Sequence, residues 1–317
     1  MAVVSFAAIG GNPIVLDDND TCIEFSGETF IDPVIFSFNI GSFVFALRWY
    51  GVLVMTGVSA AAWFAGREVA RRGEKSDAIW DLLIWILPAG ILGARLWYVI
   101  NATFGGNPYY LQNPIKILYV WEGGLHIYGG FVLGVVVMFY YLRQHKMDIW
   151  LFLDAIAPMA LLGQAIARPA NFINQELYGP PTNLPWGIPI DAAHRLAAYA
   201  DLAQYPLSTR FHPDFAYEMI WNFLAVGLIL YVSHRFADKA KPGAVFFCWL
   251  VLAGLGRFLL EFYRPDQPQV GGTWITTTQV ATIVMMLVGL LMLAYRYGKL
   301  NLPLPPLPEK YTLSGDA

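Results

Sequence analysis

The sequence contains few charged residues and very few cysteines. Only 14% of its 317 residues are charged, against about 25% in ordinary soluble proteins, and 57% are hydrophobic, which argues against a soluble enzyme or a disordered chain. A net charge of −3 provides no overall basic surface, so we expect no nucleic-acid partner. The two cysteines, Cys22 and Cys248, are too few for a disulfide framework, a zinc cluster or an iron–sulfur centre built from this chain alone.

Long apolar runs dominate the sequence instead. A helix needs about 20 mostly apolar residues to cross the roughly 30 Å hydrocarbon core of a bilayer, and several runs reach that length. We therefore predict an all-α integral membrane protein with about seven transmembrane helices. The predicted spans are residues 43–66, 78–100, 123–142, 149–166, 215–234, 243–263 and 276–297.

Lysine and arginine are distributed unevenly between the connections. Twelve basic residues fall on one side of the predicted bundle: Arg67, Arg71, Arg72, Lys75, Arg143, Lys146, Arg235, Lys239, Lys241, Arg296, Lys299 and Lys310. The opposite connections hold only Lys116, Arg195, Arg210 and Arg264, and residues 1–42 contain no lysine or arginine but several acids: Asp17, Asp18, Asp20, Glu24 and Glu28. The positive-inside rule therefore predicts an N-terminus outside and a C-terminus in the cytoplasm.

The spans divide the chain into three parts. Residues 1–42 form an outer extension, residues 43–297 the seven-helix transmembrane domain, and residues 298–317 a proline-rich cytoplasmic tail. One long outer segment, residues 167–214, connects the fourth and fifth helices. A loop of this length is more often functional than incidental.

Four arginines lie within or at the edge of apolar runs: Arg48, Arg95, Arg168 and Arg257. A charge in such a place costs roughly 2.5–3.5 kcal/mol on insertion scales and requires a partner or a wet cavity. Snorkelling to the interface or pairing with a buried acid would explain any one of them. Four together indicate a binding site for an anion.

The predicted sixth helix carries a charged stripe near its outer end. Glu261 follows Arg257 by four residues and Arg264 follows Glu261 by three, a spacing that places all three on one helical face. An ion pair would neutralise two of the three charges, and the remaining cation would then require an external anion. At this depth the abundant anion is a phospholipid phosphate, which arginine binds bidentately.

Two polar clusters occur at the same outer side. The first extends from the fourth helix into the outer segment and contains Arg168, Asn171, Asn174, Gln175, Glu176, Tyr178 and Gly179. The second opens the third helix, where His126 and Tyr128 lie among four glycines. An ordinary interfacial turn would explain the first cluster, and a hydrogen-bonded interface histidine would explain the second. Taken with the arginines, both favour an outward-facing site for a phospholipid headgroup.

At these residues the sequence closely resembles the bacterial prolipoprotein diacylglyceryl transferase family, over about Asp32 to Tyr297. The segment from Arg168 to Gly179 is the most specific part of the resemblance. Further matching positions are Asp32–Phe36, Arg48–Gly51, Gly93–Arg95, Trp121–Gly124, Gly129, Gly130, His212, Pro213, Tyr217, Glu218, Arg257, Glu261 and Arg264.

The resemblance implies a reaction, its partners and a location. The diacylglyceryl group of phosphatidylglycerol would move to the lipobox cysteine thiol of a preprolipoprotein, forming a thioether and releasing glycerol phosphate. The protein would be a multi-pass protein of the bacterial cytoplasmic (inner) membrane, in contact with membrane lipid and with its active site toward the periplasm. The family uses no metal and no soluble cofactor.

The resemblance also assigns site residues. Arg168 and Arg257 match the functional cations of the family, and the expected phosphatidylglycerol site further includes Tyr50, Asn171, Glu176, Gly179, Glu261 and Arg264. Members often carry a histidine directly before the glycine pair of the third helix; here that position is Tyr128, and the histidine is His126. Three candidates for the base therefore remain: His126, Tyr128, or no side chain at all if the arginines lower the pKa of the substrate thiol.

Two other functions are compatible with buried arginines and a lipid site. One is a lipid transporter or flippase, which would place polar groups at mid-membrane rather than crowded at the outer ends of the helices. The other is a non-catalytic protein that binds anionic lipid. Neither would form a covalent product.

Overall fold

The computed structural model describes residues 31–40, 43–264, 267–271 and 273–314, together with four two-residue strands near the N-terminus. These strands are β1 (Ala8–Ile9), β2 (Asn12–Pro13), β3 (Val15–Leu16) and β4 (Cys22–Ile23). The acids expected in the outer extension, Asp17, Asp18, Asp20, Glu24 and Glu28, lie outside the described residues.

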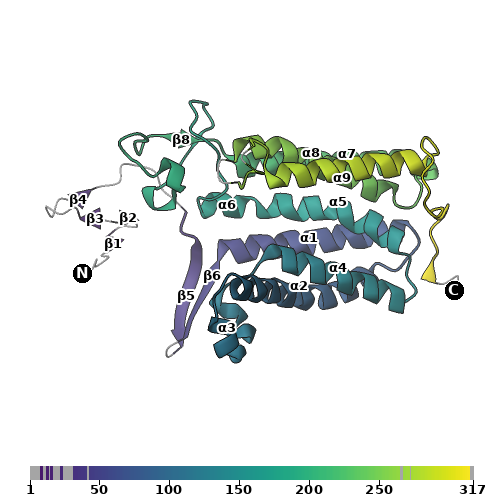
Figure 1. Cartoon of the computed structure of the whole chain (residues 1–317), viewed down its shortest axis with the longest axis horizontal. Helices are drawn as coiled ribbons and strands as arrows, with labels where there is room; N and C mark the ends of the chain where they lie inside the picture. The colour runs from purple at the N-terminus through teal and green to yellow at the C-terminus, as the bar shows by residue number, and fades with distance from the viewer. Residues whose placement is uncertain are drawn as a thin grey trace.

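Seven long helices run side by side (Figure 1), and each is long and apolar enough to cross a membrane. They are α1 (Trp49–Arg71), α2 (Asp77–Phe104), α4 (Ile127–Gln144), α5 (Ile149–Ala167), α7 (Asp214–Arg235), α8 (Ala244–Leu260) and α9 (Thr277–Arg296). The prediction of a seven-helix, predominantly α-helical membrane protein is confirmed.

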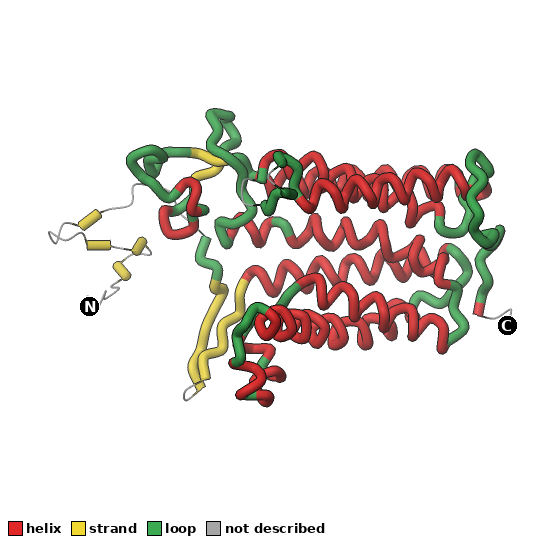
Figure 2. The backbone as a smooth tube through the Cα atoms, viewed as in Figure 1, coloured by secondary structure: helices red, strands yellow, loops and turns green. Residues whose placement is uncertain are grey.

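The first helix starts later than predicted. Residues 43–48, which we expected to open the first span, form strand β6 (Phe43–Arg48), and it pairs antiparallel with β5 (Val34–Ile40). The helix begins only at Trp49. Figure 2 shows this hairpin extending crosswise from the ends of the helices. An apolar run rich in aromatic and β-branched residues suits a strand as well as a helix, so apolarity alone placed the boundary wrongly.

The helices pack around α5, which lies between α1 on one side and α7 and α8 on the other. Half of its spanning stretch is buried, and Leu151, Phe152 and Ala155 are completely enclosed. Small residues allow close helix contacts elsewhere in the bundle. A Cβ atom added to Gly93 of α2 would lie 2.3 Å from the carbonyl oxygen of Gly129 in α4, so this crossing tolerates only glycine.

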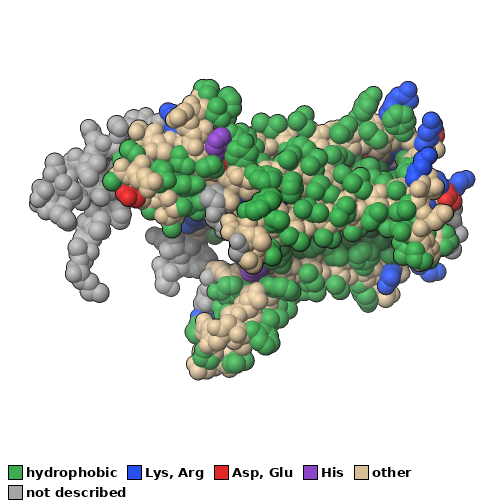
Figure 3. Space-filling view, turned by 45° about the horizontal axis from the view of Figure 1, so that its top comes forward, with side chains coloured by type: hydrophobic (Ala, Val, Ile, Leu, Met, Phe, Trp, Pro, Cys, Tyr) green, Lys and Arg blue, Asp and Glu red, His purple; other side chains and the backbone are tan. Residues whose placement is uncertain are grey.

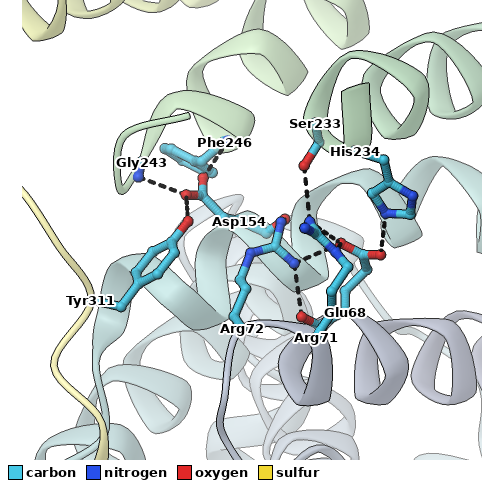
Figure 4. A network of polar contacts seen from close by, with 9 residues as sticks. All are labelled: Glu68, Arg71, Arg72, Asp154, Ser233, His234, Gly243, Phe246 and Tyr311. Carbon is cyan, nitrogen blue, oxygen red and sulfur yellow. Dashed lines mark hydrogen bonds and ion pairs between the residues drawn. The ribbon is translucent and has the colours of Figure 1, made fainter. Parts of the chain in front are cut away.

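Lysine and arginine side chains gather at one end of the bundle, the end that carries the C-terminus (Figure 3). We call it the basic end. Beneath its surface, Asp154 of α5 is fully buried and accepts hydrogen bonds from the backbone N–H groups of Gly243, at 2.6 Å, and Phe246, at 2.7 Å (Figure 4). Asp154 thus binds the first turn of α8, where free N–H groups and the helix dipole favour a carboxylate.

A second buried acid, Glu68 of α1, lies in the same network. Its carboxylate contacts Arg71 at 2.9 Å, Arg72 at 2.6 Å and His234 of α7 at 2.7 Å (Figure 4). Arg71 also donates to the hydroxyl of Ser233 at 3.1 Å. The network therefore ties α1 to α7 at the basic end.

The proline-rich tail lies against the basic end of the bundle. Arg296 donates to the carbonyl oxygens of Leu307 and Pro308, and the Ser314 hydroxyl donates to Glu74 at 2.7 Å. The Tyr311 hydroxyl reaches Asp154 at 2.7 Å and supplies its third hydrogen bond (Figure 4). The described part of the tail is therefore bound to the helices and not merely extended from them.

We expect Tyr311→Phe to destabilise the protein by about 1–3 kcal/mol, because it removes one donor from a buried carboxylate. Thermal unfolding of the purified protein in detergent measures the effect. Tyr140→Phe is the matched control, because Tyr140 is 65% exposed and its loss should leave the unfolding temperature unchanged. Equal unfolding temperatures in both variants would contradict a stabilising role for the Tyr311 contact.

Candidate active site

The polar cluster around Arg168 lies at the end of the bundle opposite the basic end, which we call the site end. Helix α5 ends at Ala167, and a short helix, α6 (Pro169–Ile173), continues the chain directly after Arg168. Pro169 is the first residue of α6, a position where its missing N–H breaks no hydrogen bond. The fourth span is therefore longer than the predicted residues 149–166, and Arg168 lies inside it at the junction of two helices.

Arg168 is held by an acid from a distant part of the sequence. Its Nη2 forms an ion pair with Glu218 of α7, and its Nη1 donates to the Asn171 side chain at 3.3 Å. The Nε of Arg168 is buried and has no hydrogen-bond partner among the described residues. One guanidinium donor therefore stays unused inside the cluster.

Asn171 and Glu176 extend this network. The Asn171 amide donates to Glu176 Oε1 at 2.7 Å, and the backbone N–H of Glu176 donates to the carbonyl of Asn171 at 2.9 Å. Because Asn171 also accepts from Arg168, it links the carboxylate of Glu176 to the guanidinium. The structure brings these three predicted residues together.

The chain turns sharply directly after α6. Gln175 and Leu177 both have positive φ, at 52° and 56°, a left-handed conformation that is unusual for residues other than glycine. Two hydrogen bonds hold this turn: the Gln175 amide donates to Asp191 at 2.8 Å, and the backbone N–H of Asp191 donates back to Gln175 at 2.7 Å. The chain therefore leaves its helical path only after α6 and not at Pro169.

The outer segment has a small core of its own. Strands β7 (Ile188–Pro189) and β8 (Arg210–Phe211) pair, and Tyr178, Ile190, Tyr199 and Phe211 are buried together beside them. Arg195 is also buried and donates to the backbone carbonyls of Ile190, Tyr205, Pro206 and Leu207. Arg195 therefore has a structural role. The small core of the outer segment holds in place the chain that follows the Arg168 cluster.

Gly179 marks the closest approach between this segment and the helices. A Cβ atom there would lie 2.7 Å from an Asp214 carboxylate oxygen and 2.9 Å from the carbonyl oxygen of Tyr263. Glycine is therefore the only residue that fits between the start of α7 and the end of α8.

The second predicted cation, Arg257, is located on α8. Its Nη2 lies 2.6 Å from Glu261 Oε2, as the four-residue spacing predicts, and Thr276 donates to Glu261 Oε1 at 2.6 Å. Helix α8 packs against α5, which Arg168 directly follows, and against α7, which carries Glu218. The two predicted cations therefore come from neighbouring helices.

The expected stripe of three charges does not extend to Arg264. Helix α8 ends at Leu260, residues Glu261–Tyr263 form a 3₁₀ turn, and the Arg264 backbone is extended, with φ −105° and ψ 101°. A helical spacing rule applies only within a continuous helix, so the prediction of a common face is wrong for Arg264.

A hydrogen-bonded group of aromatic side chains borders the Arg168 cluster. The Tyr217 hydroxyl is hydrogen-bonded to His212 Nδ1 at 3.0 Å and accepts from the Trp186 indole at 2.8 Å. Burial lowers the pKa of His212, because the charged imidazolium loses hydration there. His212 is therefore neutral at pH 7, and it adds no further positive charge beside the arginines.

His126 and Tyr128 lie on the other side of the bundle, at the start of α4. The backbone N–H of His126 donates to the carbonyl of Ala94 at 2.9 Å, and the two rings are 5.2 Å apart. His126 Nδ1 is buried without a hydrogen-bond partner in the described parts of the chain, whereas Tyr128 is 64% exposed. No hydrogen bond or ion pair between described residues links this pair to Arg168.

The remaining intramembrane arginines differ from Arg168 and Arg257. Arg95 is buried and donates to the backbone carbonyls of Lys116, Ile117 and Gly123, so it fastens the loop before α4. Arg48 is exposed at the end of β6. Tyr50, in the first turn of α1, is 45% exposed, and α1 packs against α6.

Comparison with known proteins supports one family for this arrangement. The family model described as prolipoprotein diacylglyceryl transferase matches residues 33–295. Three curated relatives are similar over most of their length, and each is named phosphatidylglycerol–prolipoprotein diacylglyceryl transferase, the second with the number 2. The relative from Chloroflexus aggregans is 37% identical over 80% of this chain and 86% of its own length. The relative from Streptomyces coelicolor is 41% identical over 70% of this chain and 67% of its own length. The relative from Symbiobacterium thermophilum is 36% identical over 84% of this chain and 93% of its own length.

This chain belongs to the prolipoprotein diacylglyceryl transferase family. It is a multi-pass membrane enzyme that transfers a diacylglyceryl group. The transferase has two polar centres at its site end, the arginine cluster on α5 to α8 and the His126–Tyr128 pair on α4.

Sequence reasoning did not predict the partner of Arg168. Glu218 is one of the positions that match the family resemblance, but nothing in the sequence paired it with Arg168, which lies fifty residues away. In the structure Glu218 lies in the first turns of α7, beside Tyr217. Pairings across such a distance follow from helix packing and not from spacing.

We expect Gly179→Ala to displace the outer segment of the transferase, because its Cβ would meet Asp214 and Tyr263 at less than 3 Å. Overpacking of this kind destabilises proteins by about 1–3 kcal/mol. Thermal unfolding and limited proteolysis of the outer segment measure the effect. The control is Gly227→Ala in α7, where a Cβ has no atom within 4 Å. A Gly179→Ala protein as stable as the Gly227→Ala control would rule out this steric requirement.

Proposed function

We propose that this chain transfers the diacylglyceryl group of phosphatidylglycerol to the lipobox cysteine thiol of a preprolipoprotein. The thiol sulfur forms a bond to the glyceryl carbon, the carbon–oxygen bond to the phosphate breaks, and glycerol phosphate leaves with the electron pair. The names of the relatives supply the lipid and the prolipoprotein. The observation that carries the proposal is the pair of arginines, Arg168 and Arg257, which lie on neighbouring helices at the site end and are each ion-paired to a carboxylate.

Arg168 and Arg257 would stabilise the leaving phosphate. Negative charge grows on the phosphate oxygens as the carbon–oxygen bond breaks, and cations held in advance near those oxygens lower the barrier most effectively. Each arginine is oriented by one carboxylate, Glu218 or Glu261. A guanidinium has five donors, so an ion pair with one carboxylate leaves others for a phosphate. Arg264 would add positive charge beside Arg257.

The other matched residues would position the headgroup or the cations. Asn171 and Glu176 hold Arg168 in place, and Gly179 allows the outer segment to approach α7. Tyr50 is exposed in the first turn of α1, a helix that packs against α6, and would orient the glycerol headgroup. None of these roles calls for a metal or a soluble cofactor.

His126 is the better of the two side-chain candidates for the base. An imidazole titrates near neutral pH and a phenol does not, so histidine accepts a thiol proton more readily. The buried Nδ1 of His126 also has no hydrogen-bond partner among the described residues, whereas Tyr128 is mostly exposed. Thiol activation by the positive arginines alone is the remaining candidate.

The site end would face the periplasm from the bacterial inner membrane. The supporting observation is the concentration of lysine and arginine at the basic end, which the positive-inside rule places in the cytoplasm. A transporter or flippase, or a non-catalytic lipid-binding protein, would use the same cations without forming a thioether.

Arg168→Ala should reduce diacylglyceryl transfer by about 10²–10³-fold, the usual effect of removing a group that stabilises transition-state charge. Purified protein in micelles containing phosphatidylglycerol is incubated with a lipobox peptide, and the peptide mass and released glycerol phosphate are measured. Arg67→Ala at the basic end is the control and should retain activity. Activity of the Arg168→Ala protein at the wild-type level would refute the assignment, and bound lipid without any adduct in the wild type would favour a transporter or scaffold.

His126→Ala should lower the rate by about 10²–10⁴-fold, the range for loss of a general base, while Tyr128→Phe should have little effect. The same peptide assay, run from pH 5 to 9, also tests whether the ionisation that limits the wild-type rate disappears in the His126 variant. If His126→Ala loses little activity and Tyr128→Phe is inactive, Tyr128 is the base. If both variants are active, the arginines activate the thiol without a side-chain base.

A further inference from the structure

An open cavity of about 450 Å³ lies at the basic end, between α7, α8 and α9. Its size is within the range of about 300–1,000 Å³ that is typical of small-molecule pockets. It extends along α7 from Phe236 to Leu228, about 12 Å at the rise of an α-helix. The arginine cluster lies at the opposite end of the bundle, so this cavity is not part of the active site.

The floor of the cavity belongs to the protein interior, and its rim faces the membrane. Ile229 and Val245 on the floor are almost completely buried, whereas Leu228 and Leu290 on the rim are 51% and 53% exposed. The cavity is therefore a groove that opens sideways toward the lipid rather than a sealed void.

The chemistry of the groove changes along its length. Apolar side chains line almost all of it, while Lys239, just beyond the end of α7, is its only charged lining residue. The Lys239 ammonium makes no ion pair with any residue in the described ranges, and Arg235 lies one turn earlier in the chain, its guanidinium over the Phe236 ring. A long apolar groove ending in an unpaired cation is complementary to an amphiphile with an anionic head.

No described segment of the chain fills the groove. The tail runs past Arg296 to Asp154 and Glu74, and none of residues 301–314 lines the cavity. Glu309 of the tail pairs with Lys241, at 3.0 Å, and not with Lys239. Because the groove opens toward the surrounding lipid, a lipid of the bilayer fits it as the occupant.

We propose that this groove binds one acidic phospholipid of the leaflet at the basic end. Its phosphate lies on Lys239, and one acyl chain extends between α7 and α8 toward Leu228. Such a lipid binds only the folded bundle, so it stabilises the contact between α7 and α8. It is separate from the lipid consumed at the site end.

The test uses full-length protein in nanodiscs with two photoactivatable lipids of identical acyl chains, phosphatidylglycerol and phosphatidylcholine, each with a diazirine on the chain. Labelled peptides are mapped by mass spectrometry, which separates adducts on residues 228–252 and 290–297 from those at the site end. We expect the phosphatidylglycerol probe to label the groove at least about fivefold more than the phosphatidylcholine probe, since a juxtamembrane cation favours an acidic lipid by roughly that factor.

Two matched pairs of variants test the two parts of the site. Lys239→Glu should reduce groove labelling by phosphatidylglycerol to the phosphatidylcholine level, whereas Arg143→Glu, a reversal at an exposed cation outside the groove, should not. Cys248→Phe should fill the groove and abolish labelling, while Cys248→Ala should preserve it. Lys239 is exposed at the surface, so its variant remains informative if Cys248→Phe fails to fold.

Three results would overturn the proposal. Equal labelling by both probes would identify ordinary surrounding lipid. An absence of adducts in the groove with adducts at the site end would show that no lipid binds here. Labelling unchanged in Lys239→Glu would show that the cation does not select the lipid.

Discussion

The absence of water in the membrane interior constrains every polar side chain of this protein. A charge that enters the apolar layer must find its hydrogen bonds inside the chain, or its burial opposes folding. Asp154 meets this requirement with two backbone donors and one phenol, and Arg95 meets it with backbone carbonyls. The architecture of both ends of the bundle follows from this one condition.

The two ends of the bundle satisfy the hydrogen bonds of their charged groups to different degrees. At the basic end the acids Glu68 and Asp154 have several partners each, and Tyr311 of the tail is one of the partners of Asp154 (Figure 4). At the site end Arg168 has one acid and one amide, and its Nε is left unused. Fully satisfied polar groups hold helices together, whereas incompletely satisfied ones are available to a ligand. Arg168, the buried charge proposed to serve catalysis, is therefore less completely satisfied by the described residues than Glu68 or Asp154.

Sequence reasoning was most accurate for features that depend on a property summed over neighbouring residues, such as apolarity. Seven apolar runs predicted seven helices, because crossing the bilayer depends on total apolarity over about 20 residues. The same reasoning misplaced the start of α1, since residues 43–48 are equally apolar but pair with β5. Apolar surroundings alone also grouped Arg95 with Arg168, and only the family resemblance distinguished the two. Only the structure shows that the first fastens a loop and the second meets an acid from α7.

The sequence by itself determined the number of spans, the asymmetry of charge and the set of candidate site residues. The tertiary structure decided which of them meet: Arg168 with Glu218, Glu176 with Asn171, and Gly179 with Asp214. It also separated Arg264 from the helical face of Arg257, because α8 ends before it. Membrane insertion depends on apolarity that can be added up along the chain. An ion pair depends on a distance of a few ångströms between side chains, and helix packing sets that distance.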